Sequence, residues 1–264
     1  MNRSAVNARA RPKVASQEGA KLNRFRRDHH LIDSANKVIY CVVAKNACST
    51  MKFQFLRRLS EDRGYSFDPE GVNRNVHRLA ISHSMRDLPK TMDEYYTFCI
   101  VRHPIERLVS AFLEKFVRLP DFVPFGRELL KGRYSGSKDD LRFVDFISAI
   151  MSSPLNELNE HWMPQADHLI DGVQYDLIEM RSIARHPKLT DLYTDLSSNI
   201  RPHTTSYGEV SVNASAMTSR ELNKFKAKNG YYPKWTAFKT EDVDRMIAPA
   251  FDRDLPLWER AWRG

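Results

Sequence analysis

Two short segments of the chain combine cationic, hydroxyl and small side chains in a pattern suited to binding a phosphate-like anion. In the first, AKNACST (residues 44–50), Lys45 precedes the hydroxyl groups of Ser49 and Thr50. The lysine supplies a mobile cation, and the hydroxyls supply hydrogen-bond donors. An apolar run precedes this segment and an amphipathic stretch follows it, which predicts a strand leading directly into a helix. The unpaired N–H groups and dipole of a helix N-terminus would complete an anion site there.

This first segment differs from the glycine-rich phosphate-binding loop. The signature GxxxxGK[ST] is absent, because residues 44–50 contain no glycine and Lys45 stands near the start of the turn. Taken alone, the segment is equally compatible with an ordinary capped turn that carries a solvated lysine.

The second segment is IVRHPIERLVSAF, residues 100–112. Arg102 follows an apolar run, and Pro104 stands where a helix would begin. Ser110 would lie two turns into that helix. Considered singly, Arg102 is better explained as a surface salt-bridge partner and Ser110 as a small residue for helix packing.

The elements that must position these residues alternate along the chain. Apolar runs predict strands at residues 38–43, 97–101 and 175–180, and helical periodicity predicts helices at 51–59, from Pro104 onward, at 141–151 and from Thr240, as N-cap, to about Phe251. This alternation predicts an α/β fold with three layers and a mostly parallel central sheet. Ligands bind at the carboxyl ends of parallel strands, so Lys45 and Arg102 are expected to face one crevice.

Together the two segments resemble the cofactor-binding segments of the carbohydrate sulfotransferases, the family of the chondroitin, dermatan and HNK-1 enzymes. A third segment, NEHWMPQADHL at residues 159–169, is similar to the family's histidine-tryptophan-x-proline segment. The resemblance runs from about residue 38 to 179. Ala44, Met51 and His103 depart from the usual proline, tryptophan and acidic residue, and a cysteine usual behind the third segment is missing. The matching residues are Lys45, Ala47, Cys48, Ser49 and Thr50 in the first segment and Arg102, Pro104, Arg107, Leu108, Ser110 and Ala111 in the second.

The resemblance implies a P-loop NTPase-like sulfotransferase fold and sulfuryl transfer from 3′-phosphoadenosine 5′-phosphosulfate (PAPS) to a hydroxyl of a carbohydrate or glycolipid. Lys45 would meet the bridging oxygen of the leaving phosphate, and no metal is needed. Arg102 and Ser110 would hold the 3′-phosphate, because the planar guanidinium binds two phosphate oxygens. The remaining implied cofactor-binding residues are Asn46, Ala47, Cys48, Ser49 and Thr50, chiefly through backbone N–H groups.

The acceptor hydroxyl must lose a proton, and a histidine or glutamate is the natural base. Related sulfotransferases place a histidine between the first helix and the arginine-bearing strand. His77 is the first candidate in that interval and His83 the second. Either could instead only cap or pack the loop. Glu160 and His161 are held in reserve, since their loop is expected to reach the same crevice.

The composition is that of a globular protein, with 42% hydrophobic and 28% charged residues. The net charge is +8, and residues 1–30 contain eight basic residues against two acidic ones. We predict a flexible basic arm at 1–30, able to contact an anionic membrane or glycan, and a single domain at 31–264. Neither a signal peptide nor a membrane-spanning run is evident, and the three cysteines do not suggest a disulfide framework. A cytoplasmic, soluble, bacterial-type enzyme of unknown oligomeric state is expected.

Several segments between these elements carry weaker predictions. Residues 61–75 are expected to form a loop, residues 76–88 an irregular or short helical stretch, and residues 120–140 a long connection that could serve as a substrate lid. The polar stretch 201–208 is a weak match to a loop that closes over the nucleotide. The pair His29 and His30 has no cysteine or carboxylate cluster that would complete a metal site.

Two other classes of function remain open. A nucleotide-dependent kinase with a degenerate phosphate loop would use the same crevice, although it would want glycines and a magnesium-binding carboxylate. A basic nucleic-acid-binding protein has only the arm in its favour, and we expect no nucleic-acid partner because no recognition helix or aromatic platform is evident.

Overall fold

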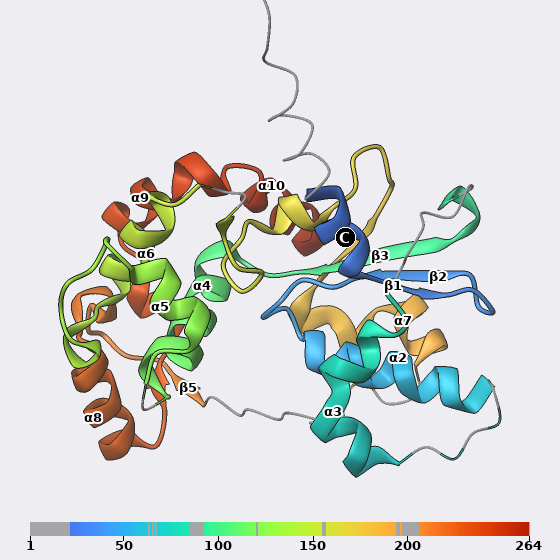
Figure 1. Cartoon of the computed structure of the whole chain (residues 1–264), viewed down its shortest axis with the longest axis horizontal. Coiled ribbons are helices and arrows are strands. Elements are labelled where there is room, and N and C mark those ends of the chain that lie inside the picture. The colour runs from blue at the N-terminus through green and yellow to red at the C-terminus, as the bar shows by residue number, and fades with distance from the viewer. Residues whose placement is uncertain are drawn as a thin grey trace, which may run out of the picture.

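The computed structural model describes residues 22–62, 64, 66, 68–84, 92–119, 121–154, 157–193, 196 and 206–263 (Figure 1). Its centre is a four-stranded sheet in the order β1 (His30–Asp33), β2 (Val38–Cys41), β3 (Tyr96–Val101) and β4 (Asp176–Glu179). β2 pairs parallel with β3, and β3 pairs parallel with β4, whereas β1 forms an antiparallel hairpin with β2. The predicted α/β fold with a mostly parallel sheet is therefore confirmed.

Helices cover both faces of this sheet, because alternate side chains of each strand point to opposite sides. On one face Tyr40, Phe98 and Ile100 pack against α2 (Cys48–Asp62), α3 (Pro69–Ile81) and α7 (Pro187–Leu192). On the other face Cys41 and Cys99 share a smaller cluster with Ala261 of α10 (Asp254–Arg263). Figure 1 shows α10 and these three helices on opposite sides of the strands.

A second group of helices stands beside the sheet and is joined to it by α4 (Pro104–Phe112), which leaves the carboxyl end of β3 (Figure 1). The helix continues as one π-helical turn over Leu113–Val117. The group is completed by α5 (Pro124–Leu130), α6 (Phe143–Met151), α8 (Ser219–Asn229) and α9 (Glu241–Phe251). Its core consists mainly of aromatic side chains, among them Phe112, Phe116, Phe143, Phe146 and Trp162.

Short elements complete the described part of the chain. A two-stranded parallel pair joins β5 (Tyr207–Gly208) to β6 (Tyr232–Pro233). The 3₁₀ turns lie at Met92–Glu94, Lys138–Asp140, Gln165–His168, Met180–Arg185, Ala214–Ala216 and Trp235–Phe238. Among the described helices, none is long and apolar enough to cross a bilayer.

Most predicted elements are present, but two segments predicted as loops contain helical residues. Residues 61–75 include the first turns of α3, because Asp68 caps the helix by accepting from the Glu70 N–H and Pro69 begins it. Residues 120–140 contain α5, which likewise begins at a proline, Pro124. The predicted cap of α9 is confirmed, since Thr240 accepts from the Val243 N–H, but α10 follows it and was not predicted. Residues 85–88 and 201–205 of two predicted stretches lie outside the described residues.

The described part of the chain begins before residue 31. Residues 22–28 form a helix, and His30 belongs to β1. Arg26 is buried, where its guanidinium donates to the Asp167 carbonyl (3.1 Å) and to the carboxylate of Asp171 (2.9 Å). Residues 22–30 of the predicted arm are therefore described, and the division into an arm and a single domain stays a prediction. Residues 1–21 lie outside the described residues, so an arm there remains a prediction.

Candidate active site

The turn between β2 and α2 has an unusual backbone conformation. Lys45 and Ala47 both lie in the left-handed region, with φ of 71° and 55°. This conformation costs a residue with a Cβ about 1–2 kcal/mol relative to the right-handed region. Left- and right-handed residues in alternation bring successive N–H groups to the same side of the chain, which creates an anion-binding concavity. Two non-glycine residues therefore take the conformation that glycines adopt more readily.

A buried polar network holds the turn in this shape. Asn46 is fully buried and donates to the Ile100 carbonyl (2.8 Å) and to Oε1 of Gln165 (2.6 Å). Gln165 also accepts from the Arg102 N–H (3.0 Å) and donates to the Arg102 carbonyl (2.9 Å). Asp254, at the start of α10, accepts from the N–H groups of Gln165 and Ala166, both at 2.9 Å. The network fixes the turn to the end of β3, so Asn46 supports the turn from beneath rather than facing its open side.

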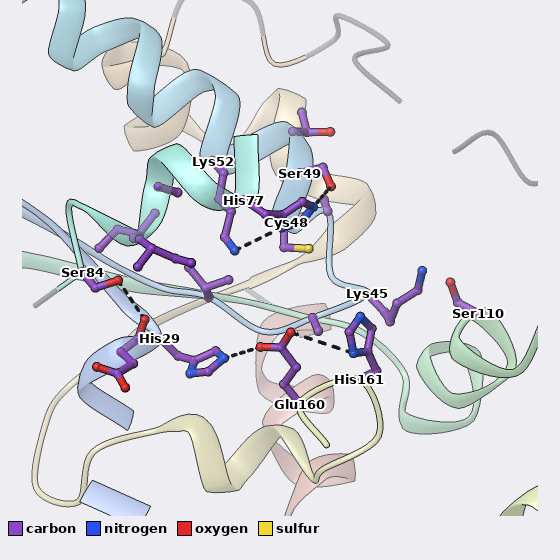
Figure 2. A pocket seen from close by; sticks show the side chains of 18 of the residues that line it. His29, Lys45, Cys48, Ser49, Lys52, His77, Ser84, Ser110, Glu160 and His161 are labelled. Carbon is purple, nitrogen blue, oxygen red and sulfur yellow. Dashed lines mark hydrogen bonds and ion pairs between the residues drawn. The ribbon is translucent and has the colours of Figure 1, made fainter. Parts of the chain in front are cut away.

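A cavity of about 820 Å³ lies in front of this turn (Figure 2). The helix α2 begins at its wall, where the first N–H groups have no partner within the helix. Five of the predicted cofactor-binding residues line the cavity from the turn: Lys45, Ala47, Cys48, Ser49 and Thr50. The other polar residues of its walls are Arg24, Asp28, His29, Lys52, His77, Ser84, Ser110, Glu114, Lys115, Glu160 and His161.

Lys45 forms an ion pair with Glu114, which lies in the π-helical turn after α4. Glu114 also contacts Lys115, whose Nζ lies 2.8 Å from Oε1. Burial raises the pKa of Glu114, but the charges of the two lysines outweigh it and lower that pKa to about 2. Burial lowers the pKa of Lys45, and Glu114 acts in the opposite direction. The carboxylate therefore holds the Lys45 ammonium within the cavity.

Ser110 and Arg102, the two residues of the second segment predicted to bind the cofactor, lie in different environments. Ser110 lines the cavity near Lys45 (Figure 2). Arg102 is buried behind the turn, where its guanidinium donates to the Lys45 carbonyl (3.0 Å) and to Glu106 (3.1 Å). Its Nε is buried without a hydrogen-bond partner within the described structure. Arg181 contacts the other oxygen of Glu106 at 2.9 Å.

Arg107, a matching residue for which the sequence suggested no role, is almost completely buried. It donates to the carbonyls of Ala44 (2.9 Å), Met163 (2.7 Å) and Glu160 (2.7 Å). One guanidinium thereby links the anion turn to the loop that carries Glu160 and His161.

The structure separates the two histidines predicted as bases. His77, on α3, faces the cavity, with Nε2 3.2 Å from the Ser49 hydroxyl and Nδ1 3.3 Å from Nζ of Lys52. Burial and the charge of Lys52 lower the pKa of His77. His83 is not among the residues that line the cavity, and its ring lies 6.4 Å from that of Phe55.

The reserve candidates Glu160 and His161 both line the cavity, on the wall opposite Lys52 and His77 (Figure 2). His29 forms an ion pair with Glu160. The hydrogen bond from His29 lowers the pKa of Glu160 to about 2, against the opposing effect of burial. Nδ1 of His161 lies 3.9 Å from the second oxygen of Glu160 and 2.5 Å from Oδ1 of Asn159.

The site thus combines an anion turn, a held lysine and a set of polar groups on the facing wall. A profile of the sulfotransferase family matches residues 28–257, well over half of the 264-residue chain. The chain belongs to the sulfotransferase family. This result confirms the resemblance inferred from the sequence motifs, although a bacterial-type, soluble origin remains a prediction.

Curated relatives of this chain are carbohydrate sulfotransferases. It is 28% identical to carbohydrate sulfotransferase 14 of Mus musculus over 169 residues, which cover 57% of this chain and 42% of the relative. It is 27% identical to carbohydrate sulfotransferase 10 of Homo sapiens over 169 residues, covering 58% and 46%. It is 26% identical to carbohydrate sulfotransferase 11 of Rattus norvegicus over 153 residues, covering 51% and 43%. The matches span less than half the length of each relative. No solved structure gives a significant match.

Some residues of the candidate site could not be singled out from the sequence. Glu114 follows Ser110 by four residues, and helical spacing could have placed it on the same face. His29 carries no sequence signal beyond its position next to His30. Gln165 and Asp254 reach the turn from positions 119 and 208 residues beyond Asn46, and no local pattern indicates such a contact.

Proposed function

We propose that this sulfotransferase moves a sulfuryl group from PAPS to a hydroxyl of a carbohydrate or glycolipid. The observation that carries the proposal is the Lys45 ammonium held at the mouth of an anion-binding turn. Membership of the family supports a sulfate donor, and the names of the relatives support a carbohydrate acceptor.

The residues present fit a donor with two anionic groups. Backbone N–H groups at the start of α2 and the hydroxyls of Ser49 and Thr50 would hold the 5′-phosphosulfate. Ser110 of α4 lines the cavity near Lys45 (Figure 2), and the buried Nε of Arg102 has no partner in the described structure. We assign the 3′-phosphate to these two residues. To reach it, the Arg102 guanidinium would exchange part of its contact with Glu106 for the phosphate.

The β2–turn–α2 unit supports a relation to the P-loop NTPase-like folds. In a P-loop, glycines permit the backbone to curl around phosphate. In this chain Lys45 and Ala47 adopt left-handed conformations, and Asn46 anchors them through buried hydrogen bonds. We propose that the buried hydrogen bonds of Asn46 stabilise the left-handed turn that glycines make possible in a P-loop.

PAPS supplies an activated sulfuryl group whose leaving group is a phosphate. Negative charge develops on the oxygen that bridges sulfur and phosphorus as that bond breaks. Lys45 is proposed to neutralise this oxygen, with Glu114 holding the ammonium in position before the donor arrives. Preorganised charge of this kind contributes roughly 10²–10³ in rate per group.

A thermal-shift titration tests the class of ligand. Adenosine 3′,5′-bisphosphate at about 100 times its Kd should stabilise the protein by about 2.7 kcal/mol, which corresponds to a Tm increase of roughly 5–10 °C for a chain of this size. Adenosine 5′-monophosphate, ATP with magnesium, and a DNA oligonucleotide serve as comparisons. Preferential stabilisation by ATP with magnesium would point to a kinase, and preferential stabilisation by the oligonucleotide to a nucleic-acid binder. Either result would overturn the proposal.

A further inference from the structure

Two histidines face the cavity from opposite walls, and their ring nitrogens differ in their hydrogen-bond partners. His77 comes from α3, and His161 from the loop before the 3₁₀ turn at Gln165–His168. A general base needs an uncharged nitrogen whose lone pair is free to accept a proton. The hydrogen-bond partners of each ring therefore distinguish the two candidates.

Both nitrogens of His77 are occupied. The ammonium of Lys52 lies 3.3 Å from Nδ1, and because an ammonium can only donate, Nδ1 must accept. Nε2 then carries the hydrogen and donates to the Ser49 hydroxyl, 3.2 Å away. Protonation of Nδ1 would place a second positive charge beside Lys52. Through Ser49 and Lys52, His77 belongs to the wall that faces the donor phosphates.

His161 has the opposite arrangement. Its backbone N–H donates to Oδ1 of Asn159 at 3.1 Å, which identifies that atom as the amide oxygen. The same oxygen lies 2.5 Å from Nδ1, so Nδ1 carries the ring hydrogen. The lone pair is therefore on Nε2, for which the described part of the chain provides no hydrogen-bond partner. In Figure 2 the His161 ring lies beside the Lys45 side chain.

The orientation of the His161 ring is fixed by packing. Phe125 of α5 stacks on it, with ring centroids 5.2 Å apart and an interplanar angle of 7°. The hydrogen bond from Nδ1 to Asn159 fixes the rotation of the ring within that plane. Reactive groups held in one geometry avoid an entropic cost at the moment of reaction.

The charges around His161 come from three elements. Lys45 belongs to the turn, Glu114 and Lys115 to the π-helical segment, and Glu160 precedes His161 in its own loop. Burial and then the charge of Lys115 lower the pKa of His161 to about 3, with Glu160 opposing. The imidazole is consequently neutral at physiological pH.

We propose that His161 is the general base that accepts the proton of the acceptor hydroxyl, and that Asn159 is a positioning residue that fixes its tautomer. This inference rests on the proposed sulfuryl transfer. In the step, the acceptor O–H bond breaks and its proton passes to Nε2. The acceptor oxygen forms a bond to sulfur, and the bond from sulfur to the phosphate oxygen breaks. That oxygen keeps the electron pair and is neutralised by Lys45.

The arrangement also links proton acceptance to donor binding. Without a ligand, the positive charges of Lys45 and Lys115 disfavour an imidazolium at His161. An anionic phosphosulfate beside Lys45 offsets this field, so the basicity of His161 rises only once the donor is in place. The acceptor is therefore activated next to a donor rather than next to water alone.

The test compares His161→Ala and His161→Gln with His77→Ala, and with His186→Ala as a control away from the cavity. Turnover is measured with PAPS and whichever carbohydrate the wild type sulfates in a panel of unsulfated chondroitin and neutral oligosaccharides. Both His161 variants should lose about 10²–10⁴-fold in kcat and keep wild-type affinity for adenosine 3′,5′-bisphosphate, which also reports that they are folded. Added imidazole should restore part of the turnover of His161→Ala. His77→Ala should mainly weaken nucleotide binding.

A pH profile separates catalysis from packing. Asn159→Asp keeps the acceptor for Nδ1–H but adds a negative charge beside the ring, which raises the pKa of His161 by roughly 1–3 units. Since only the unprotonated ring can act, the acid limb of kcat/KM for the carbohydrate should move to higher pH by that amount. If His161 only packed the loop, the acid limb of the kcat/KM profile would not shift in Asn159→Asp.

The outcomes distinguish the two proposals. A wild type that transfers sulfate, together with a His161→Ala variant within threefold of its kcat, overturns the role of His161 and leaves the sulfotransferase proposal standing. A pH profile of kcat/KM that is identical in Asn159→Asp and in the wild type also overturns the role of His161 and leaves the sulfotransferase proposal standing. A wild type that sulfates no member of the panel and is not stabilised by adenosine 3′,5′-bisphosphate overturns the proposed function itself.

Discussion

Replacing Lys45 by methionine removes the ammonium at the mouth of the turn and keeps most of the volume of the side chain. The immediate consequence falls on Glu114, whose carboxylate would retain only Lys115 as a cationic partner. Removing one member of a buried ion pair leaves an incompletely compensated charge, which destabilises the folded state. The same substitution removes the group proposed to neutralise the leaving oxygen.

The size of the stability effect follows from the pKa of Glu114. The difference between its ordinary value of 4.5 and about 2 in the folded protein corresponds to roughly 3 kcal/mol in favour of the carboxylate, at about 1.4 kcal/mol per pKa unit. Two lysines share this stabilisation. Burial lowers the pKa of Lys45, so its removal also relieves a desolvation cost. Lys45→Met should therefore reduce the free energy of unfolding by about 1–2 kcal/mol at pH 7.

The assay is urea unfolding followed by tryptophan fluorescence, for which the buried Trp162 is a reporter, together with turnover in the folded variant. Adding Glu114→Gln to Lys45→Met removes the uncompensated charge and should recover most of the lost stability, whereas kcat should stay roughly 10²–10³-fold below wild type. A double variant less stable than Lys45→Met would contradict the pairing. Turnover near wild type in folded Lys45→Met would refute the role of Lys45.

Three further predictions concern other parts of the chain. Arg102→Ala should abolish the preference for adenosine 3′,5′-bisphosphate over adenosine 5′-monophosphate, measured by calorimetry; a wild type that binds both alike would refute the assignment. Deleting residues 1–21 should leave nucleotide affinity unchanged, because no described residue of the cavity precedes Arg24; a large loss would make the arm part of the site. Burial lowers the pKa of His30 from 6.5 to about 4, so only unfolded chains bind this proton between those values, and up to about 3 kcal/mol of stability should be lost as pH falls from 6.5 to 4. His30→Gln should flatten that dependence in urea unfolding, and an unchanged slope would count against it.

The sheet and its flanking helices were largely predictable because burial imposes a periodic pattern on the sequence. Val38 to Cys41 and Tyr96 to Val101 are apolar runs covered on both faces, and each is recognisable without tertiary information. The helix α5 and the first turns of α3 were not predicted, although Asp68, Pro69 and Pro124 carry the expected local signals. The predicted short helical stretch at 76–88 overlaps the second half of α3. The helix α10 was missed as well. Its sequence also carries local signals, because Asp254 and Pro256 stand in its first turn, where both residue types are well accommodated.

The candidate site was predictable in part for a different physical reason. Lys45 and Ser110 sit at fixed offsets from strand and helix boundaries, so local structure alone brings them to the crevice. The left-handed conformation of Lys45 and Ala47 could not be read from residue types that normally avoid it. It depends on Asn46, which is anchored by residues distant in sequence. Contacts of that kind have no period and no local signature.

Arg107 gives a physical reason why the two walls of the cavity can act together. The proposed leaving-group neutralisation at Lys45 and the proposed proton acceptance at His161 require a defined separation, and both residues lie outside regular helices and strands. The buried guanidinium of Arg107 donates to the Ala44 carbonyl, next to Lys45, and to the Glu160 carbonyl, next to His161. Its planar set of donors fixes both carbonyls in direction as well as distance, which a lysine could not do. The spacing of the reacting groups is thus set from within the core, by one residue of the first turn of α4 that touches neither donor nor acceptor.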